Sequence, residues 1–235
     1  MFWYLVGMAD SRSLSERLAK MPPGRHLVPR DFVTQNQRER MLLATAELVA
    51  ERGYQKTTIE LIAKTARVAL STFYEQFSSK EECFLAAFDA ALDSASRAFE
   101  ELVDAELPWA ERVAAGIEVF LEMVAANPAR ARLVIVESQA AGGEALMRYQ
   151  GALELAAQQL RAGREHNPRS IRLPDGLEVA IAGGLAWLVH QRLLAGRDSE
   201  IVGLLPEMVQ VTLTPYVGEE EAAKLADAAQ ARAAA

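Results

Sequence analysis

Hydroxyl-bearing and aromatic side chains are concentrated in one short segment, residues 66–80, with the sequence ARVALSTFYEQFSSK. The segment holds five hydroxyl side chains and three aromatic rings but few charges. Hydroxyl groups donate hydrogen bonds to phosphate oxygens and can bond base edges. The central LSTFYEQF is too short for a helix that spans a domain. We interpret it as a short helix that begins with two hydroxyls and ends with aromatic residues.

The sequence lacks the common catalytic motifs. It contains no Gly-x-Ser-x-Gly, His-Glu-x-x-His or Cys-x-x-Cys motif and no phosphate-binding glycine loop. Its three histidines and single cysteine leave few pairs of nucleophile and base. Cys83 alone excludes an intramolecular disulfide framework and a zinc site with several cysteines. We therefore predict that the protein is not an enzyme and has no cofactor and no metal ion.

Charge is distributed unevenly along the 235 residues, whose net charge is −7. Residues 1–80 hold 12 Lys and Arg against 8 Asp and Glu, whereas residues 81–235 hold 13 against 24. The N-terminal part is therefore basic enough to tolerate phosphate, and the acidic remainder is not. This asymmetry favours a nucleic-acid-binding N-terminal domain on an otherwise acidic protein.

The first 32 residues have no sustained apolar period and are rich in cations, proline and glycine. The run MFWYLVG is too short to cross a membrane and follows no cationic segment, so we expect neither a signal peptide nor a membrane helix, and a cytoplasmic protein. Two roles stay open for the cations of this arm and of the residues that follow: entry into a minor groove or simple solubility. These residues are Arg25, His26, Arg30, Arg38 and Arg40.

From about residue 34 onward, apolar residues recur at helical spacing and no segment alternates over a strand length. The first helix should end at Gly53, and the second should begin at TTIE, where Thr57 and Glu60 have the spacing of a capping box. Ser79 and Glu82 form the same pattern before a long helix. We predict an all-α protein with a three-helix helix-turn-helix domain at the N-terminus and a larger helical domain after it.

The last two long helices, at about residues 177–195 and 200–217, are apolar on more than one face. A single core does not require two such faces, so we predict that part of this surface forms a dimer interface. The domains expected from the whole pattern are an arm (1–32), the helix-turn-helix domain (33–80), an effector-binding and dimerisation domain (81–218) and an Ala-rich tail (219–235). The interface candidates are Leu185, Leu188, Leu204, Met208, Val211 and Thr212.

In a helix-turn-helix, the first residues of the second motif helix face the base edges. Phe73 and Phe77 would then anchor that helix inward, and its N-terminal residues would point toward the groove. The sequence RERMLLATAELVAERGYQKTTIELIAKTARVALSTFYEQFSSKEECF, within about residues 36–90, resembles the DNA-binding domain of tetracycline-repressor (TetR) family regulators.

The resemblance implies a homodimeric repressor whose N-terminal domains bind a palindromic DNA operator and whose C-terminal domain binds a small-molecule effector. By position, Thr58, Tyr74 and Lys80 would contact phosphates. The residues expected to contact bases are Ala69, Leu70, Ser71 and Thr72.

Three positions depart from the family pattern: Arg67 replaces a frequent glycine, Gln76 a frequent histidine and Leu70 a frequent cation. A non-glycine residue in a left-handed turn costs about 1 kcal/mol, so the turn at Arg67 is either strained or different in shape. With few cations to bond guanine, the recognition helix should instead pack methyl groups against thymine, so we predict A·T pairs beneath it.

An apolar effector of unknown identity would bind between helices of the C-terminal domain. Glu137 could bond such a ligand, cap a helix end or point to water, and His190 is interpreted as a structural histidine near Trp187. The competing function is a helical small-molecule-binding protein without operator function. The pocket candidates are Phe120, Met123, Glu137, Met147, Tyr149 and Trp187.

Overall fold

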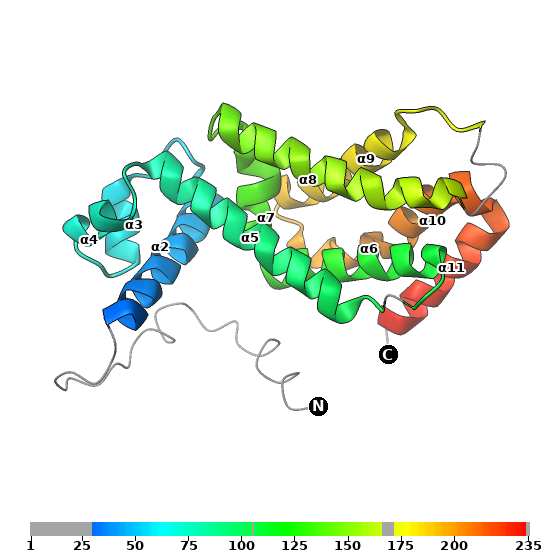
Figure 1. The fold of residues 1–235 in the computed structure, drawn as a ribbon, viewed down its shortest axis with the longest axis horizontal. Coiled ribbons are helices and arrows are strands. Elements are labelled where there is room, and N and C mark those ends of the chain that lie inside the picture. The colour runs from blue at the N-terminus through cyan, green and yellow to red at the C-terminus, as the bar shows by residue number, and fades with distance from the viewer. Residues whose placement is uncertain (1–29, 105, 166–171, 234–235) are drawn as a thin grey trace. The chain divides into compact units, whose positions relative to one another are not determined.

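The computed structural model describes residues 30–104, 106–165 and 172–233, which are helical and contain no strand (Figure 1). The chain divides into residues 1–36 and 37–235. Of the first part, only residues 30–36 are described, and they form the start of a helix. Most of the arm expected at residues 1–32, with Arg25 and His26, therefore lies outside the described residues.

Three helices form the N-terminal domain: α2 (Arg30–Arg52), α3 (Ile59–Thr65) and α4 (Leu70–Gln76). Helix α2 ends where Gly53 adopts a φ of +82°, a left-handed conformation that glycine accepts without a steric cost. Phe73 and Phe77 are buried, at 0% and 1% exposure, as the sequence predicted. They share one apolar core with Met41, Ala44, Leu48, Ile62, Ala66 and Cys83.

The start of α3 differs from the prediction by one residue. Thr58, not Thr57, is the N-cap, and its hydroxyl accepts the N–H of Leu61 at 3.3 Å. The Thr57 side chain is buried and donates to the carbonyl of Gly53 at 2.9 Å. Two adjacent threonines offer the same capping chemistry, and the tight turn after α2 decides which one caps the helix.

Helix α5 (Lys80–Leu102) begins at the predicted N-cap, Ser79, which accepts the N–H of Glu82 at 3.1 Å. The Glu82 carboxylate bonds the N–H and the hydroxyl of Ser78, not the N–H of Ser79. These bonds lower the pKa of Glu82. Helix α5 thus starts at a fixed position relative to the end of α4.

Helix α5 connects the N-terminal domain to the rest of the chain, as Figure 1 shows. Its first turn contributes Cys83 to the N-terminal core, where the thiol lies 3.2 Å from the Thr45 hydroxyl. Burial raises the pKa of this thiol to about 11, so it stays neutral. The next turns enter a second core, which contains Ala46, Val49, Tyr54, Phe84, Leu85, Ala87, Phe88, Leu133, Ala141 and Ala145.

The C-terminal body consists of helices separated by prolines, glycines and short irregular turns. Pro108 precedes α6, and Pro128 occupies the first turn of α7, positions in which proline is accepted. The predicted last helix begins at Leu205, because two 3-10 turns, η5 (Asp198–Glu200) and η6 (Val202–Leu204), precede it. The long helices are α6 (Trp109–Ala126), α8 (Gly143–Arg161), α9 (Leu177–Leu194) and α10 (Leu205–Val217).

Short helix α7 (Pro128–Ala131) continues as a π-helical turn, η1 (Arg132–Val136), and a 3-10 turn, η2 (Glu137–Gln139). After Arg132, the η1 residues 133–136 are all apolar, and the structure explains this pattern. Leu133 is buried in the second core, whereas Ile135 is buried in the main core of the body. The η1 turn therefore touches both cores, and π-helical turns are frequent at functional sites.

The expected tail is a packed helix. Residues 219–233 form α11 (Glu219–Ala233), in which Ala222, Ala226 and Ala229 are buried in the same core as α6 and α10. Small side chains at a spacing of three or four residues let this helix approach its neighbours closely. The Ala-rich segment is thus part of the body.

A buried ion pair between Arg164 and Glu178 holds the start of α9 in place. The Glu178 carboxylate is fully buried and receives two bonds from the Arg164 guanidinium, at 2.6 and 2.9 Å, and one from the Tyr216 hydroxyl at 3.0 Å. Burial alone raises the pKa of Glu178, but these bonds outweigh it and hold the pKa below its usual range. Arg164 also bonds the carbonyls of Leu173 and Pro174. The ion pair joins η3 (Ala162–Glu165), α9 and α10.

Candidate nucleic-acid interface

The turn between α3 and α4 holds Arg67 in the left-handed conformation, with a φ of 53°. The position thus keeps the backbone shape expected of the frequent glycine, although an arginine occupies it. Arg40 of α2 stabilises the turn by donating to the carbonyls of Ala66 and Arg67. Burial and the charge of Arg67 lower the pKa of Arg40.

Helix α4 presents one buried and one exposed face. Leu70 and Tyr74 are 42% and 53% exposed, and Ser71 is exposed beside them. Ala69, the N-cap, is also exposed, and Thr72 is half-buried. The structure therefore brings all four candidate base-contacting residues to the start of one short helix whose opposite face is packed into the core.

The three candidate phosphate-contacting residues lie at the start of α3, on α4 and at the start of α5. Thr58 and Tyr74 are exposed, so both hydroxyls can donate to an incoming oxygen. Lys80 is half-buried, and its ammonium donates to the carbonyl of Tyr54 at 2.9 Å. The same Nζ lies 4.0 Å from the centre of the Tyr54 ring, and burial lowers its pKa.

The described cations near the arm have structural contacts. Arg38 lies over the ring of Phe77, with its Cζ 4.4 Å from the ring centre. Arg40 supports the turn after α3. The minor-groove role left open for Arg40 is thus replaced by a role in shaping the helix-turn-helix; sequence alone gives no sign of this contact because the partners are backbone carbonyls 26 and 27 residues away.

The six residues suggested for an effector pocket do not gather around one cavity. Met147 and Trp187 are 65% and 58% exposed, on α8 and α9. Phe120 packs against the main core of the body, whereas Tyr149 packs against the second core. Apolar periodicity identifies helix faces but does not tell which faces meet. The remaining two candidates are Met123, half-buried on α6, and Glu137.

Glu137 makes a contact that the sequence left undecided. Its Oε2 accepts the backbone N–H of Tyr54 at 2.8 Å, immediately after the end of α2. Both carboxylate oxygens would lie within 4 Å of a Cβ at Gly53. The carboxylate thus bonds the N-terminal domain across 83 residues of sequence, so its assignment to an effector pocket is corrected.

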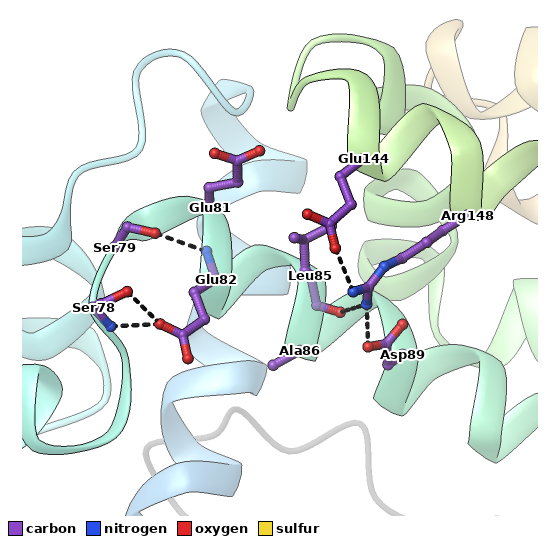
Figure 2. A pocket seen from close by; sticks show the side chains of 9 residues that line it. All are labelled: Ser78, Ser79, Glu81, Glu82, Leu85, Ala86, Asp89, Glu144 and Arg148. Atoms are coloured by element: carbon purple, nitrogen blue, oxygen red, sulfur yellow. Dashed lines mark hydrogen bonds and ion pairs between the residues drawn. The ribbon is translucent and has the colours of Figure 1, made fainter.

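A polar groove of about 380 Å³ lies along the first turns of α5 and the start of α8. Figure 2 shows that its charged side chains largely bond one another or nearby backbone groups. Arg148 bonds Asp89, Glu144 and the carbonyl of Leu85. The groove is lined by Ser78, Ser79, Glu81, Glu82, Leu85, Ala86, Asp89, Glu144 and Arg148, and this lining does not suit a largely apolar effector.

The candidates for the dimer interface fall into two groups. Leu204, Met208 and Thr212 are at most 3% exposed and belong to the interior of the chain itself, so their assignment to an interface is wrong. Val211 is 52% exposed, and Leu185 and Leu188 are half-buried. The two helices were each predicted to have more than one apolar face, but the sequence does not say which face turns inward. The structure adds three exposed apolar residues on α9: Val179, Trp187 and Leu194.

His190 stacks on the Trp187 ring, with centroids 5.1 Å apart and an interplanar angle of 12°. Among the described residues, its Nδ1 is buried without a hydrogen-bond partner. Across all residues that the structure describes, no group of three or more His, Cys, Asp or Glu side chains could hold a metal ion. None of the helices described is long and apolar enough to cross a membrane.

Helix α4 is short and has an exposed face, it follows a tight turn, and it packs on a three-helix core. These features define a DNA-binding protein of the helix-turn-helix class. Residues 41–87 match the family described as "Bacterial regulatory proteins, tetR family". The chain is 28% identical over 192 residues to the HTH-type transcriptional regulator EthR of Mycolicibacterium smegmatis; the match covers 76% of this chain and 83% of EthR.

Two solved structures share the fold. The fatty acid degradation regulator FadR from Bacillus halodurans superposes with a TM-score of 0.67 at 19% identity, over 83% of this chain and 98% of that one. FadR from Bacillus subtilis in complex with stearoyl-CoA gives a TM-score of 0.61 at 22% identity, over 77% and 98%. Residues 41–87 therefore match the DNA-binding domain of the TetR family, and the longer chain shares the fold of these two structures.

Proposed function

We propose that the protein is a ligand-responsive repressor that binds a palindromic operator as a homodimer. The observation that carries this proposal is that helix α4 has one face buried in the core and the other exposed. Phe73 and Phe77 hold one face in the core, and Leu70, Ser71 and Tyr74 are exposed on the other. A helix anchored in this way can enter a major groove without losing its support.

Base contacts are proposed for Ala69, Leu70, Ser71 and Thr72. None of these side chains is a cation, so the bidentate contact that Arg or Lys makes with guanine is unavailable to them. Their methyl groups suit the C5-methyl of thymine, and their hydroxyls can bond either partner of a base pair. We expect A·T pairs at the positions beneath α4.

Phosphate contacts are proposed for Thr58, Tyr74 and Lys80. The Thr58 hydroxyl accepts the N–H of Leu61 to cap α3 and bonds the Glu60 carboxylate. Because the hydroxyl is exposed, a phosphate oxygen could replace that carboxylate as its acceptor. Tyr74 has an exposed ring that ends in a hydroxyl. Lys80 uses one of three ammonium hydrogens on Tyr54, so two remain for a phosphate.

Dimerisation is proposed through the exposed apolar side chains of α9 and α10. Trp187, Leu194 and Val211 are each more than half exposed, and Leu185 and Leu188 are half-buried beside the core. Large exposed apolar residues on adjacent helices are typical of an interface between subunits. A two-fold axis between the bodies would hold two α4 helices about 34 to 36 Å apart, the spacing of successive major grooves.

The effector is proposed to be small and largely apolar. Partly buried apolar residues, among them Val113, Phe120 and Val136, surround the main core of the body and could separate around a ligand. FadR from Bacillus subtilis, a chain of similar fold, is found in complex with stearoyl-CoA. We therefore expect a ligand with a long apolar chain, such as the acyl chain of an acyl-CoA, to reduce operator affinity. Unchanged affinity across a panel of such ligands would contradict control by an apolar effector.

The division of labour follows the domains. Residues 33–80 would bind DNA, residues 81–218 together with α11 would bind the effector and the second subunit, and no enzymatic step or cofactor is required. A regulator of this kind acts where the chromosome is, so we place it in the cytoplasm.

Selection of bound duplexes from a random DNA pool, at physiological salt, tests the proposal. The expected result is an enriched inverted repeat with A·T pairs in each half-site. Enrichment of G·C pairs throughout the contacted positions would overturn the account of base contacts. No enrichment by folded, dimeric protein would overturn operator binding and favour a small-molecule-binding protein without operator function.

A further inference from the structure

Glu137 is a charged side chain of the body that bonds the backbone beside a proposed DNA contact. Tyr54 follows the end of α2, donates its N–H to Glu137 and accepts the ammonium of Lys80 through its carbonyl. The two distances are 2.8 and 2.9 Å. One residue of the N-terminal domain is thus held between an acid of the body and the lysine at the start of α5.

The surroundings of Tyr54 make this arrangement rigid. Its side chain is 8% exposed and meets Phe84 edge to face, with ring centroids 5.1 Å apart. Its ring also supports the Lys80 ammonium at 4.0 Å. The preceding residue, Gly53, has a φ of +82°, so the backbone turns sharply just where the carboxylate binds. A shift of the Glu137 carboxylate would therefore move or release the Tyr54 backbone N–H.

The segment that carries Glu137 is joined to the effector-binding body. Glu137 begins the 3-10 turn that follows the π-helical turn η1, in which Leu133 and Ile135 enter different cores. Movement of this segment in response to packing changes in the body would move the carboxylate. A hydrogen bond to an ionised group is short and strong, which makes this contact sensitive to such movement.

We infer that Glu137 is a positioning residue for DNA binding: by holding the Tyr54 backbone it fixes the Lys80 ammonium for a phosphate, and it thereby makes operator affinity depend on the conformation of residues 132–139. The inference rests on the proposed operator binding. It goes further by assigning the contact through which the body sets that affinity.

The test compares operator affinity of Glu137→Ala, Lys80→Ala and the double variant, by fluorescence anisotropy on the duplex that the wild-type protein selects. Loss of the carboxylate should weaken binding about ten-fold. It should also lower the slope of log affinity against log salt by about 0.9, the contribution of one phosphate. Because Glu137 acts through Lys80, the double variant should bind nearly as well as Lys80→Ala alone.

Three controls isolate the positioning role. Glu51→Ala removes an exposed carboxylate from the end of α2, just before Tyr54, so it corrects for the lost negative charge. Gln55→Ala removes a second contact of this turn with the body, the 2.9 Å bond from Gln55 Nε2 to the Ala140 carbonyl, without touching Lys80. Glu137→Gln keeps an acceptor oxygen and should restore part of the affinity and of the salt slope.

Two results would overturn the inference. If Glu137→Ala binds the operator like Glu51→Ala, the carboxylate does not position Lys80. If the losses of Glu137→Ala and Lys80→Ala multiply in the double variant, Glu137 acts by another route, such as general stability. A wild-type protein that selects no duplex would instead remove the proposed function, and the inference with it.

Discussion

At the scale of single residues, Arg67 occupies a backbone conformation that suits glycine. Its φ of 53° places Cβ close to the following carbonyl, at a cost of about 1 to 2 kcal/mol. The exposed side chain gains little packing, and its positive charge repels that of Arg40. The turn retains its shape because Arg40 bonds the carbonyls on both sides of it.

Replacing Arg67 with glycine should therefore stabilise the protein. We expect Arg67→Gly to raise the free energy of unfolding by about 0.5 to 1 kcal/mol, since part of the relieved strain is offset by the greater freedom of glycine in the unfolded chain. Urea denaturation measures the change. Arg67→Ala is the matched control, because it removes the charge and keeps Cβ. If both variants gain the same free energy of unfolding, loss of the charge explains the effect, and backbone strain at Arg67 does not.

The sequence indicated that Arg67 occupies a position that favours glycine, but it did not indicate which side chains contact the turn. The resemblance to a family with glycine at this position left two possibilities for Arg67, a strained turn or a turn of another shape, and its φ of 53° shows the first. Burial of Phe73 and Phe77 followed from helical spacing. The Arg40 contact and the Glu137 contact could not be predicted, because each joins a side chain to a backbone group 26 or 83 residues away. Side-chain type and period carry no information about such partners.

At the scale of elements, the close approach of η3 to α6 depends on a glycine. A Cβ at Gly163 would lie 2.3 Å from the Trp109 ring. That indole is 5% exposed, donates to the Gln159 carbonyl at 3.2 Å and packs against Tyr216. The ring cannot move aside without breaking these contacts, so the first turn of α6 and the end of α8 require glycine here.

Gly163→Ala should lower the free energy of unfolding by about 1 to 3 kcal/mol, the usual cost of overpacking a core. Gly151→Ala is the matched substitution, since it lies within α8 with no atom near the new Cβ. That change should instead stabilise the helix by about 0.5 to 1 kcal/mol. Thermal unfolding of both variants compares them directly. A neutral Gly163→Ala would show that α6 and η3 are not tightly packed in solution.

Helical periodicity predicted most of the elements, and Gly53 marked the end of the first helix. It gave no sign of the π-helical turn, because an apolar run such as Leu133–Val136 fits several helix types. It also placed Leu204, Met208 and Thr212 on a dimer surface, since two apolar faces on one helix look alike in sequence. Residues 219–235 were set apart as a tail, because the composition of an alanine-rich segment does not tell whether it packs against the body, as α11 does.

At the scale of the whole molecule, the proposed dimer depends on the exposed Trp187 of α9. Trp187→Glu should convert the dimer to a monomer, because a charge would be buried in an apolar interface. Sedimentation velocity measures the change in mass. Met147→Glu is the control: Met147 is similarly exposed, at 65%, but lies on α8, outside the proposed interface. A Trp187→Glu protein that remains dimeric would place the interface elsewhere.

The spacing between half-sites tests the central claim, that two α4 helices of one dimer read successive major grooves. The affinity of the protein should be measured for its selected inverted repeat and for the same repeat with about 5 base pairs, half a helical turn, inserted between the half-sites. The account predicts that the insertion reduces affinity to that of a single half-site, because the second half-site then faces away from the second α4. Equal affinity for both duplexes would contradict a dimer that holds its two DNA-binding domains at a fixed separation.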